Sequence, residues 1–405
     1  MADSALKYLC DTYSNVVLYD ADGRPSIFVR HPKQNSKEFD ASLPDHVHPA
    51  FIVNNVTDPA ILIGKYMASE LTSNGTQYSL PNMPPRVSMN YDTFLTKMKA
   101  FGGNVTGMTI ADHGLLVLMA HKAGFTSHGN NNYGADYRVG TKFELSKEVN
   151  AGDKRIFRGW EYTCLVAHTT SADLLPTDAP GYWQKGKQVG GTPVVAQAAS
   201  DNHFHGYNTL TGSGPIDWNM LDDPALEADI QGNAFEQVYG FRLVNCEIQI
   251  IPDNNAANPA ADLSATSSAW KAIKPHANDS GYDLVAPGTA GTVHYNWLNN
   301  KLTLDTVAPN FDNEYRSTSF KDIAVNTANL PYVPTILYEL GLAPLPGTKV
   351  DGYFYVQMTA EERVARRGGI YSVTSSAGVG SLYCHYPRSY AFVFFGARPR
   401  SRQTA

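Results

Sequence analysis

Three stretches of the chain carry the hydrophobic spacing of helices that bury one face. Residues 90–100 place their apolar side chains on one stripe and precede a pair of glycines. Residues 109–123 repeat this design and stop at Gly124, and a shorter pattern over 335–340 stops at Gly341. The spacing therefore predicts helices at these three places.

Short apolar runs between turn-forming residues are typical of β-strands. Such runs occupy residues 50–53 and 61–66, and strand character resumes near Val293 and continues toward the C-terminus. Residues 241–251 predict one long strand, because their alternation is broken only at the end. An alternating stretch and a turn within the first 23 residues predict an N-terminal hairpin.

The pattern divides the chain into a short N-terminal segment and one large domain. Residues 1–48 end in a polar stretch and predict an attachment or oligomerisation segment separate from the main body. Residues 49–405 mix helices and strands, which predicts an α+β domain. Two polar stretches, at about 140–230 and 252–291, read as long irregular insertions on this scaffold.

Composition narrows the class of protein. Apolar residues make up 43% and charged residues 17% of 405, which predicts a folded chain. A net charge of -6 argues against a nucleic-acid binder, and the C-terminal arginines 398, 400 and 402 are interpreted as a solvated tail. The apolar runs are too short to cross a bilayer, and no signal peptide is visible at the N-terminus.

The candidate metal ligands and nucleophiles have simpler interpretations. His46 with His48, and His203 with His205, have a spacing that could seed a metal site, but ordinary loop hydrogen bonds are the favoured interpretation. The oxygen-rich triplets 253–255 and 312–314 suit Ca²⁺, yet turn-forming residues explain them more simply. The four cysteines are far apart and show no local sign of activation, which predicts a reducing compartment; they are Cys10, Cys164, Cys246 and Cys384.

The most informative segment is the aromatic stretch near the C-terminus. Arg366-Arg367-Gly368-Gly369 precedes it, and Gly396-Ala397-Arg398-Pro399 follows it. If residues 379–385 form a strand, Val379, Ser381, Tyr383 and His385 share one face, which mixes sizes and polarities and therefore favours exposure. Pro387 predicts an interruption of strand pairing and a turn. Dense amphipathic rings are typical of recognition surfaces, so the segment favours binding over catalysis.

Several pieces of the chain, taken in order, resemble a known family. These pieces are Ile63-Gly64-Lys65-Tyr66, the two longer helices, the stretches 128–134 and 232–240, and the Arg-Gly-Gly and Gly-x-Arg anchors. Together they resemble the C-type-lectin-fold variable proteins of diversity-generating retroelements, a family that includes the tropism determinants of phages, which bind receptors at the tail tip. The resemblance covers roughly residues 50–400 and implies a C-type lectin fold of the formylglycine-generating-enzyme-like subtype.

The resemblance also implies a function and a site. It implies a non-catalytic receptor-binding protein of the virion, at a tail tip or fibre, that needs no cofactor or metal. Its partners would be a bacterial surface protein or glycan, other phage tail proteins and further copies of itself, with a trimer favoured. Ligand binding would lie in the segment 366–399, with Gly369, Gly378, Leu382, Gly396 and Arg398 as scaffold. The implied contact residues are Tyr371, Val373, Ser381, Tyr383, His385, Tyr390 and Phe392.

Two other classes of protein stay open at this point. The formylglycine-generating oxidases share the fold and use paired cysteines late in the sequence, whereas this chain has only Cys384 there. A structural virion protein or a cellular surface adhesin is the third alternative. Copper binding would favour the oxidase, and an unchanged host choice after loss of the C-terminal patch would favour the third class.

Overall fold

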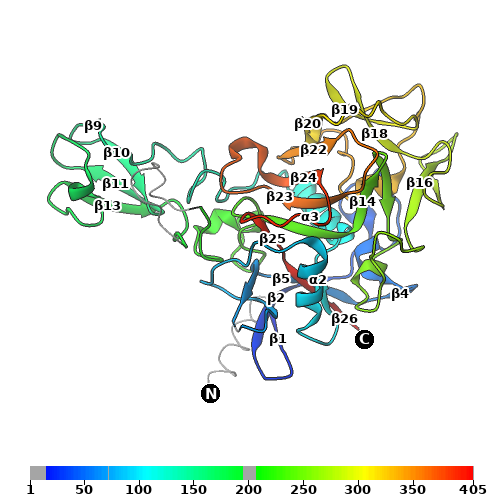
Figure 1. Cartoon of the computed structure of the whole chain (residues 1–405), viewed down its shortest axis with the longest axis horizontal. Helices are drawn as coiled ribbons and strands as arrows, with labels where there is room; N and C mark the ends of the chain where they lie inside the picture. The colour runs from blue at the N-terminus through cyan, green and yellow to red at the C-terminus, as the bar shows by residue number, and fades with distance from the viewer. Residues whose placement is uncertain (1–14, 72, 195–206, 405) are drawn as a thin grey trace.

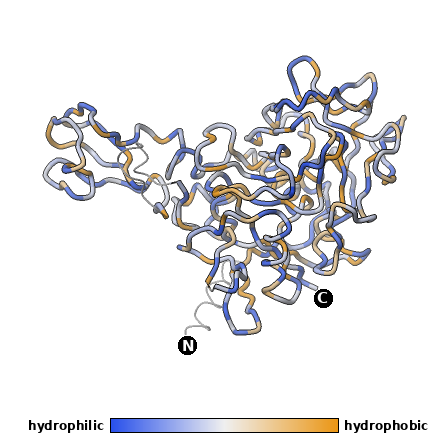
Figure 2. Tube along the Cα trace, viewed as in Figure 1, coloured by the Kyte–Doolittle hydropathy of each residue, from blue (hydrophilic) through white to orange (hydrophobic). Residues whose placement is uncertain are grey.

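The computed structural model describes residues 15–71, 73–194 and 207–404. Strands hold 34% of the residues and helices 14%, so the predicted α+β class is confirmed. The elements form a large body, and a smaller lobe that contains β9, β10, β11 and β13 projects from one side of it (Figure 1). Hydrophobic residues are more frequent along the strands inside the body than on its outer loops (Figure 2).

A twelve-stranded mixed sheet is the centre of the body. Its main path runs β20-β22-β24-β23-β14-β15-β18-β19-β21, with β16, β17 and β25 attached beside β15 and β14. The strands are β14 (Phe235–Val244), β15 (Glu247–Ile250), β16 (Lys271–Pro275), β17 (Tyr282–Val285), β18 (His294–Leu298), β19 (Lys301–Asp305), β20 (Tyr315–Ser319), β21 (Ala324–Val325), β22 (Tyr353–Gln357), β23 (Arg363–Gly368), β24 (Gly378–Tyr386) and β25 (Phe395–Gly396).

A second sheet joins the two ends of the described chain. Its order is β1-β2-β5-β26-β8, and β26 lies between β5 and β8. The predicted N-terminal hairpin is present as β1 and β2, but β2 pairs along its length with β5, so these residues belong to the main body. The strands are β1 (Asn15–Tyr19), β2 (Pro25–Pro32), β5 (Ala60–Gly64), β8 (Val105–Gly107) and β26 (Pro399–Gln403).

This second sheet corrects two predictions. The expected separation of residues 1–48 from the body is wrong for residues 15–48, because their backbone hydrogen bonds are made within the body. The expected solvated arginine tail is also wrong, because β26 is an interior strand. The side chains of Arg398 and Arg400 are fully buried, and Arg402 pairs with the buried Asp58.

The three predicted helices are confirmed. They are α2 (Tyr91–Lys99), α3 (Ile110–Ala123) and α4 (Thr335–Glu339). A capping box between Thr109 and Asp112 starts α3, and Gly124 ends it at a φ of 61°, a conformation that glycine adopts without strain. Most of α3 is buried, because it lies between β14, β24 and α4 in the main hydrophobic core.

Two strand predictions change in detail. The single strand predicted over residues 241–251 is a hairpin, in which Asn245 and Cys246 have φ values of 54° and 55° and form the turn between β14 and β15. Both strands are buried on both faces, so the turn is hidden inside one continuous apolar run. The strand predicted over 50–53 begins only at Ile52, after the 3-10 turn Pro49–Phe51.

The insertion predicted as irregular at about 140–230 contains two small sheets. β10, β11 and β13 form one and β9 and β12 the other, around a core that includes Phe143, Phe157 and Trp183. Their bounds are β9 (Glu148–Val149), β10 (Lys154–Phe157), β11 (Trp160–Cys164), β12 (His168–Thr169) and β13 (Trp183–Gln188). Residues 252–291 likewise supply the β16–β17 hairpin. Two short hairpins complete the strands: β3 (Ile52–Val53) with β4 (Val56–Thr57), and β6 (Ala68–Glu70) with β7 (Gln77–Ser79).

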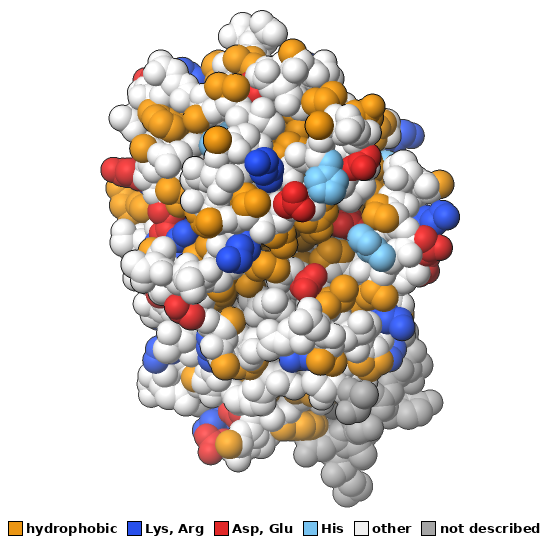
Figure 3. Space-filling model, turned by 90° about the vertical axis from the view of Figure 1, so that its right-hand side faces the viewer, with side chains coloured by type: hydrophobic (Ala, Val, Ile, Leu, Met, Phe, Trp, Pro, Cys, Tyr) orange, Lys and Arg blue, Asp and Glu red, His pale blue; other side chains and the backbone are white. Residues whose placement is uncertain are grey.

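The outer surface mixes charge signs. On the face of the body shown in Figure 3, acidic and basic side chains alternate, and small groups of hydrophobic side chains lie between them. Among the described residues, no helix combines the length and the apolar character that a membrane crossing requires.

Candidate functional site

An open pocket walled by aromatic rings lies over one face of the twelve-stranded sheet. Its volume is about 430 Å³, within the range of roughly 300–1,000 Å³ that is usual for small-ligand sites. Strands β14, β20, β22 and β24 supply most of its wall, and the loops after β23 and before β25 supply the rest. We call it the aromatic pocket; its lining residues are Phe235, Tyr315, Tyr355, Ile370, Val373, Tyr383, His385, Tyr386 and Phe394.

The pairing of β22 with β24 builds the centre of the pocket. The two strands run parallel, with Tyr355 opposite Tyr383, so the two rings stack at 4.3 Å with an interplanar angle of 13°. Phe235 on β14 reaches the other side of Tyr383, again with 4.3 Å between the ring centroids. The sheet register thus brings together rings from three separate parts of the sequence.

Hydrogen bonds to one loop hold these rings in place. The Tyr355 hydroxyl donates to Ser376 Oγ at 3.1 Å, and the Tyr383 hydroxyl donates to the Ser376 carbonyl at 3.4 Å. Ser381 Oγ donates to the same carbonyl at 2.6 Å. Because these polar ends bind to the protein, Tyr355 and Tyr383 offer mainly ring surface to the pocket.

His385 adds an imidazole ring to the pocket wall. Its ring lies 5.3 Å from that of Tyr315 and 5.7 Å from that of Tyr383. Burial, and secondarily the positive charge of Arg366, lowers the pKa of His385 to about 3. The imidazole is therefore neutral at physiological pH and can act as a hydrogen-bonding group without carrying charge.

A band of exposed aromatic side chains continues from the pocket. Tyr390 and Phe392 are 46% and 38% exposed, and Phe392 stacks on Phe394 of the pocket wall at 5.1 Å. Tyr390 contacts Tyr386, the pocket residue at the end of β24, with 5.9 Å between the rings. We call Tyr390, Phe392 and the exposed Val393 the aromatic rim. Pocket and rim form one continuous aromatic surface.

The seven sequence-predicted contact residues lie in four different places. Val373, Tyr383 and His385 line the aromatic pocket, and Tyr390 and Phe392 form its rim. Tyr371 lies apart from them, stacked on Tyr207 at 5.0 Å and 7% exposed. Ser381 is fully buried and hydrogen-bonded within the protein.

Exposure was therefore wrongly predicted for Tyr371, Ser381 and Tyr383. β24 (Gly378–Tyr386) confirms the predicted strand and ends before Pro387, as predicted. Both of its faces are covered up to Cys384, because Leu382 and Cys384 pack in the main core and Tyr383 packs against Phe235 and Tyr355. A register shift against β23 also places Val379 in the same core as Leu382 and Cys384, although alternation puts them on opposite faces.

The residues predicted as scaffold are all internal. Gly369 has a φ of 90°, and a side chain at Gly378 would come within 2.4 Å of the Asp351 backbone. Leu382 lies in the main core, and Gly396 is buried in β25. Arg398 is fully buried and donates to Glu236 as well as to four backbone carbonyls.

Sequence reasoning missed most of the pocket wall. The missed residues are Phe235, Tyr315, Tyr355, Ile370, Tyr386 and Phe394. One usable signal was the alternation Tyr353-Phe354-Tyr355, which places two tyrosines on one face of a strand. Nothing local links that strand to residue 235 or 383, because the contact depends on the order of strands in the sheet.

The candidate metal ligands serve structural roles. His46 Nε2 lies 2.5 Å from a Glu339 carboxylate oxygen, and His48 Nε2 lies 2.9 Å from the Glu339 carbonyl oxygen. Asn254 bonds to Ala50 and Asp112, and Asp312 pairs with Arg316. Across residues 15–71, 73–194 and 207–404, no group of three or more His, Cys, Asp and Glu side chains is arranged to hold a metal ion. His203, His205 and Cys10 lie outside the described residues.

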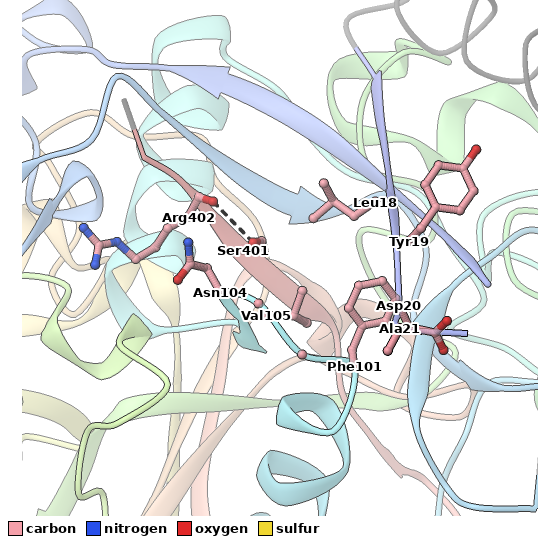
Figure 4. Close-up of a pocket in the computed structure, with 11 residues that line it drawn as sticks. Leu18, Tyr19, Asp20, Ala21, Phe101, Asn104, Val105, Ser401 and Arg402 are labelled. Carbon is pink, nitrogen blue, oxygen red and sulfur yellow. Dashed lines mark hydrogen bonds between the residues drawn. The ribbon is translucent and has the colours of Figure 1, made fainter. Parts of the chain in front are cut away.

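A second cavity, shown in Figure 4, is a weaker candidate for a functional site. It has a volume of about 420 Å³ and lies beside the loop before β8. Its charged groups have protein partners, since Asp20 binds Arg24 and Tyr78, and Arg402 binds Asp58. Arg402 also points away from Tyr19 and Phe101 in the close-up (Figure 4). The aromatic pocket is therefore the stronger candidate.

No protein-family model matches the chain, and a search of curated proteins gave no match.

Proposed function

We propose that this chain is a receptor-binding protein of a phage tail tip or fibre, with a C-type lectin fold, and that it recognises a bacterial surface molecule. The observation that carries the proposal is the continuous surface of the aromatic pocket and its rim. The segment between Gly369 and Gly396, where the resemblance puts the ligand-binding residues, supplies the rim and most of the pocket wall. Open aromatic surfaces of this kind are enriched at recognition sites.

The rigidity of the support favours recognition over catalysis. The pocket rings are fixed by a twelve-stranded sheet and by Ser376, whereas the rim side chains are exposed and replaceable. Several copies of such a site on one tail tip would raise avidity, so we propose a homo-oligomer, with a trimer favoured, bound to other tail proteins. Light scattering of the purified chain tests the oligomeric state.

The oxidase alternative requires a reactive thiol. Cys384 is fully buried in β24, and burial strongly raises the pKa of its thiol. A protonated thiol in the core is a poor nucleophile and a poor ligand for copper. This observation favours the binding function over the oxidase.

Binding of the labelled protein to a panel of bacterial strains tests the proposal. Tyr315→Ala removes a pocket side chain that is 59% exposed, so folding is expected to survive. We expect at least a tenfold loss of cell binding. Tyr332→Ala is the matched control, because Tyr332 is a 46% exposed tyrosine outside the pocket lining.

Two outcomes would contradict the proposal. If both variants bind all strains as the parent chain does, the pocket is not the recognition site. If the parent chain binds no strain and host choice is unaltered without the pocket, the structural-protein alternative is favoured.

A further inference from the structure

One arginine beside the aromatic pocket lacks the partner that its neighbours have. The structure describes four arginine side chains as fully buried with no exposed surface: Arg366, Arg367, Arg398 and Arg400. Arg367 and Arg398 both pair with Glu236, at 2.7 and 2.6 Å, and Arg400 pairs with Asp112 at 3.1 Å. Among the described residues, Arg366 makes no ion pair with a carboxylate.

The hydrogen bonds of Arg366 are also incomplete. Its Nη2 donates to the Pro387 carbonyl at 3.4 Å, whereas Nε and Nη1 have no partner in the described part of the chain. Its cross-strand neighbour on β14 is Gln237, whose buried amide is likewise unpartnered there. Such an arrangement destabilises a protein, since a buried charge normally requires a partner. Arg366 therefore has a role other than stabilising the fold.

The guanidinium lies directly behind the pocket wall. Its Cζ is 4.0 Å from the centre of the Phe395 ring and 5.5 Å from that of Tyr386, a lining residue. On β24 its cross-strand partner is Tyr383, the stacked ring at the centre of the pocket. Burial lowers the pKa of Arg366 to about 9, so the group stays protonated near neutral pH.

The charge of Arg366 is not cancelled within the pocket. No carboxylate stands among the residues that line it. After burial, the positive charge of Arg366 is the next cause of the lowered pKa of His385, so this charge acts on the pocket wall. In a surrounding of low dielectric, one unpaired charge acts over several ångströms. The pocket therefore favours a negatively charged ligand and disfavours a cation, although its ring-lined wall alone would suit a cation.

The pocket wall also limits the shape of the ligand. β22 and β24, at the centre of the pocket, are each paired on both sides and present no unpaired backbone edge to an extended peptide, whereas β20, which supplies Tyr315, ends the sheet path. Recognition at the pocket centre therefore uses ring faces and a few side-chain groups, such as His385 and the Tyr315 hydroxyl. A pyranose ring matches these demands, because it has apolar C–H faces and a polar edge, and the volume of about 430 Å³ accommodates it.

We infer that the aromatic pocket binds an acidic saccharide, a pyranose ring that carries a carboxylate, and that Arg366 supplies the preference for negative charge. The inference rests on the proposed function and deepens it by naming the ligand class. Arg366 acts from behind Tyr386 and Phe395 as a residue that sets charge specificity.

A titration with three matched sugars tests the inference. Glucuronate, methyl glucoside and glucosamine share one ring and differ in charge, and ligand-observed NMR measures weak binding. We expect glucuronate to bind about tenfold more tightly than methyl glucoside, and glucosamine to bind most weakly. In Arg366→Met the three affinities should converge, while the melting temperature stays equal or rises. Lys187→Met removes the same charge from the exposed strand β13 and should preserve the preference.

Each alternative result has a distinct meaning. Equal binding of the three sugars to the parent chain would overturn the charge preference and leave the proposed function standing. Tighter, pocket-dependent binding of N-acetyl-aspartyl-phenylalanine than of glucuronate would overturn the saccharide class in favour of an acidic peptide. No sugar binding, with cell binding still sensitive to Tyr315→Ala, would also overturn it. If Tyr315→Ala leaves cell binding intact as well, the proposed function fails.

Discussion

Two adjacent arginines lie on opposite faces of strand β23 and differ in their ion pairing. On one face, Arg367 joins Arg398 around Glu236 and donates to the Ile230 carbonyl and to His113. On the other face, Arg366 lies against Phe395 and Tyr386 without a carboxylate partner in the described residues. On the first face, both arginines and Glu236 have hydrogen-bond partners, and they join β14 to the segment before β26. The second face carries the charge of Arg366, which has no carboxylate partner in the described residues, next to an open pocket. Such an arrangement is expected where a binding site is kept at a cost in stability.

The largest expected loss of stability comes from removing the carboxylate that Arg367 and Arg398 share. Glu236→Gln keeps the shape of the side chain but leaves Arg367 and Arg398 without their shared carboxylate. Removing one partner of a buried pair costs about 3–5 kcal/mol, so we expect a loss of this size in the free energy of unfolding. Chemical denaturation measures it. A loss below about 1 kcal/mol would show that the network contributes little.

The next effect concerns the ring at the pocket centre. Tyr383 is 3% exposed and packs between Phe235 and Tyr355, so Tyr383→Ala is expected to destabilise the chain by about 3–5 kcal/mol. Thermal and chemical unfolding of the variant check this. A stability equal to that of the parent chain would mean that the ring is not packed as described.

Arg366→Met and Arg367→Met should change the free energy of unfolding in opposite directions. Arg366 has no counter-ion in the described part of the chain, so replacing its buried charge by an apolar side chain is expected to leave the free energy of unfolding unchanged or to raise it by about 1–4 kcal/mol. Arg367→Met is the matched control, and it should destabilise, since it breaks a buried pair with Glu236. If both variants lose stability equally, the contrast between the two faces of β23 is not real.

A smaller effect depends on pH and on the contacts of α4. Glu339 raises the pKa of His46. Burial acts to raise the pKa of Glu339, but the hydrogen bonds from His46 and Ser36 and the charges of His48 and His46 outweigh it and leave that pKa lowered. Stability from His46 is therefore present below pH ~6.5 and lost as pH rises through its raised pKa, whereas that from Glu339 is lost at low pH. Burial lowers the pKa of the adjacent His48, which acts in the opposite direction and loses stability as pH falls.

The free energies of unfolding of His46→Gln and of the parent chain, measured between pH 5 and 8, isolate the contribution of His46. Their difference should shrink as pH rises and stay within about 1 kcal/mol, because the His46 side chain is half-exposed. A difference that grows with pH would contradict the sign worked out for His46.

The smallest expected effect on folding lies at the rim. Tyr390→Ala should change the free energy of unfolding by only about 0.5 kcal/mol, because nearly half of the side chain is exposed. Cell binding of the same variant should still fall if the rim takes part in recognition. Unchanged binding would confine the site to the pocket itself.

Comparison of the predicted and observed elements shows where local rules suffice. Asn90 and Thr109 cap α2 and α3, and Gly124 ends α3, because capping depends on a few neighbouring residues. The hairpin turn at Asn245 and Cys246 was missed, because both adjoining strands are buried and leave no polar break in the sequence. The exposure of Tyr383 was mispredicted because alternation identifies the two faces of a strand but does not show what packs on each face.

The sequence by itself determined the α+β class, the three helices, a strand over residues 379–385 and the aromatic character of the C-terminal segment. These follow from local spacing, capping and composition. Only the tertiary structure decided that Tyr355, Phe235 and Tyr383 share one wall and that β26 lies inside a sheet. It also decided that Arg367 pairs with a carboxylate, whereas Arg366 has no carboxylate partner among the described residues. The physical reason is that burial and pairing depend on strand order and register between segments far apart in the sequence.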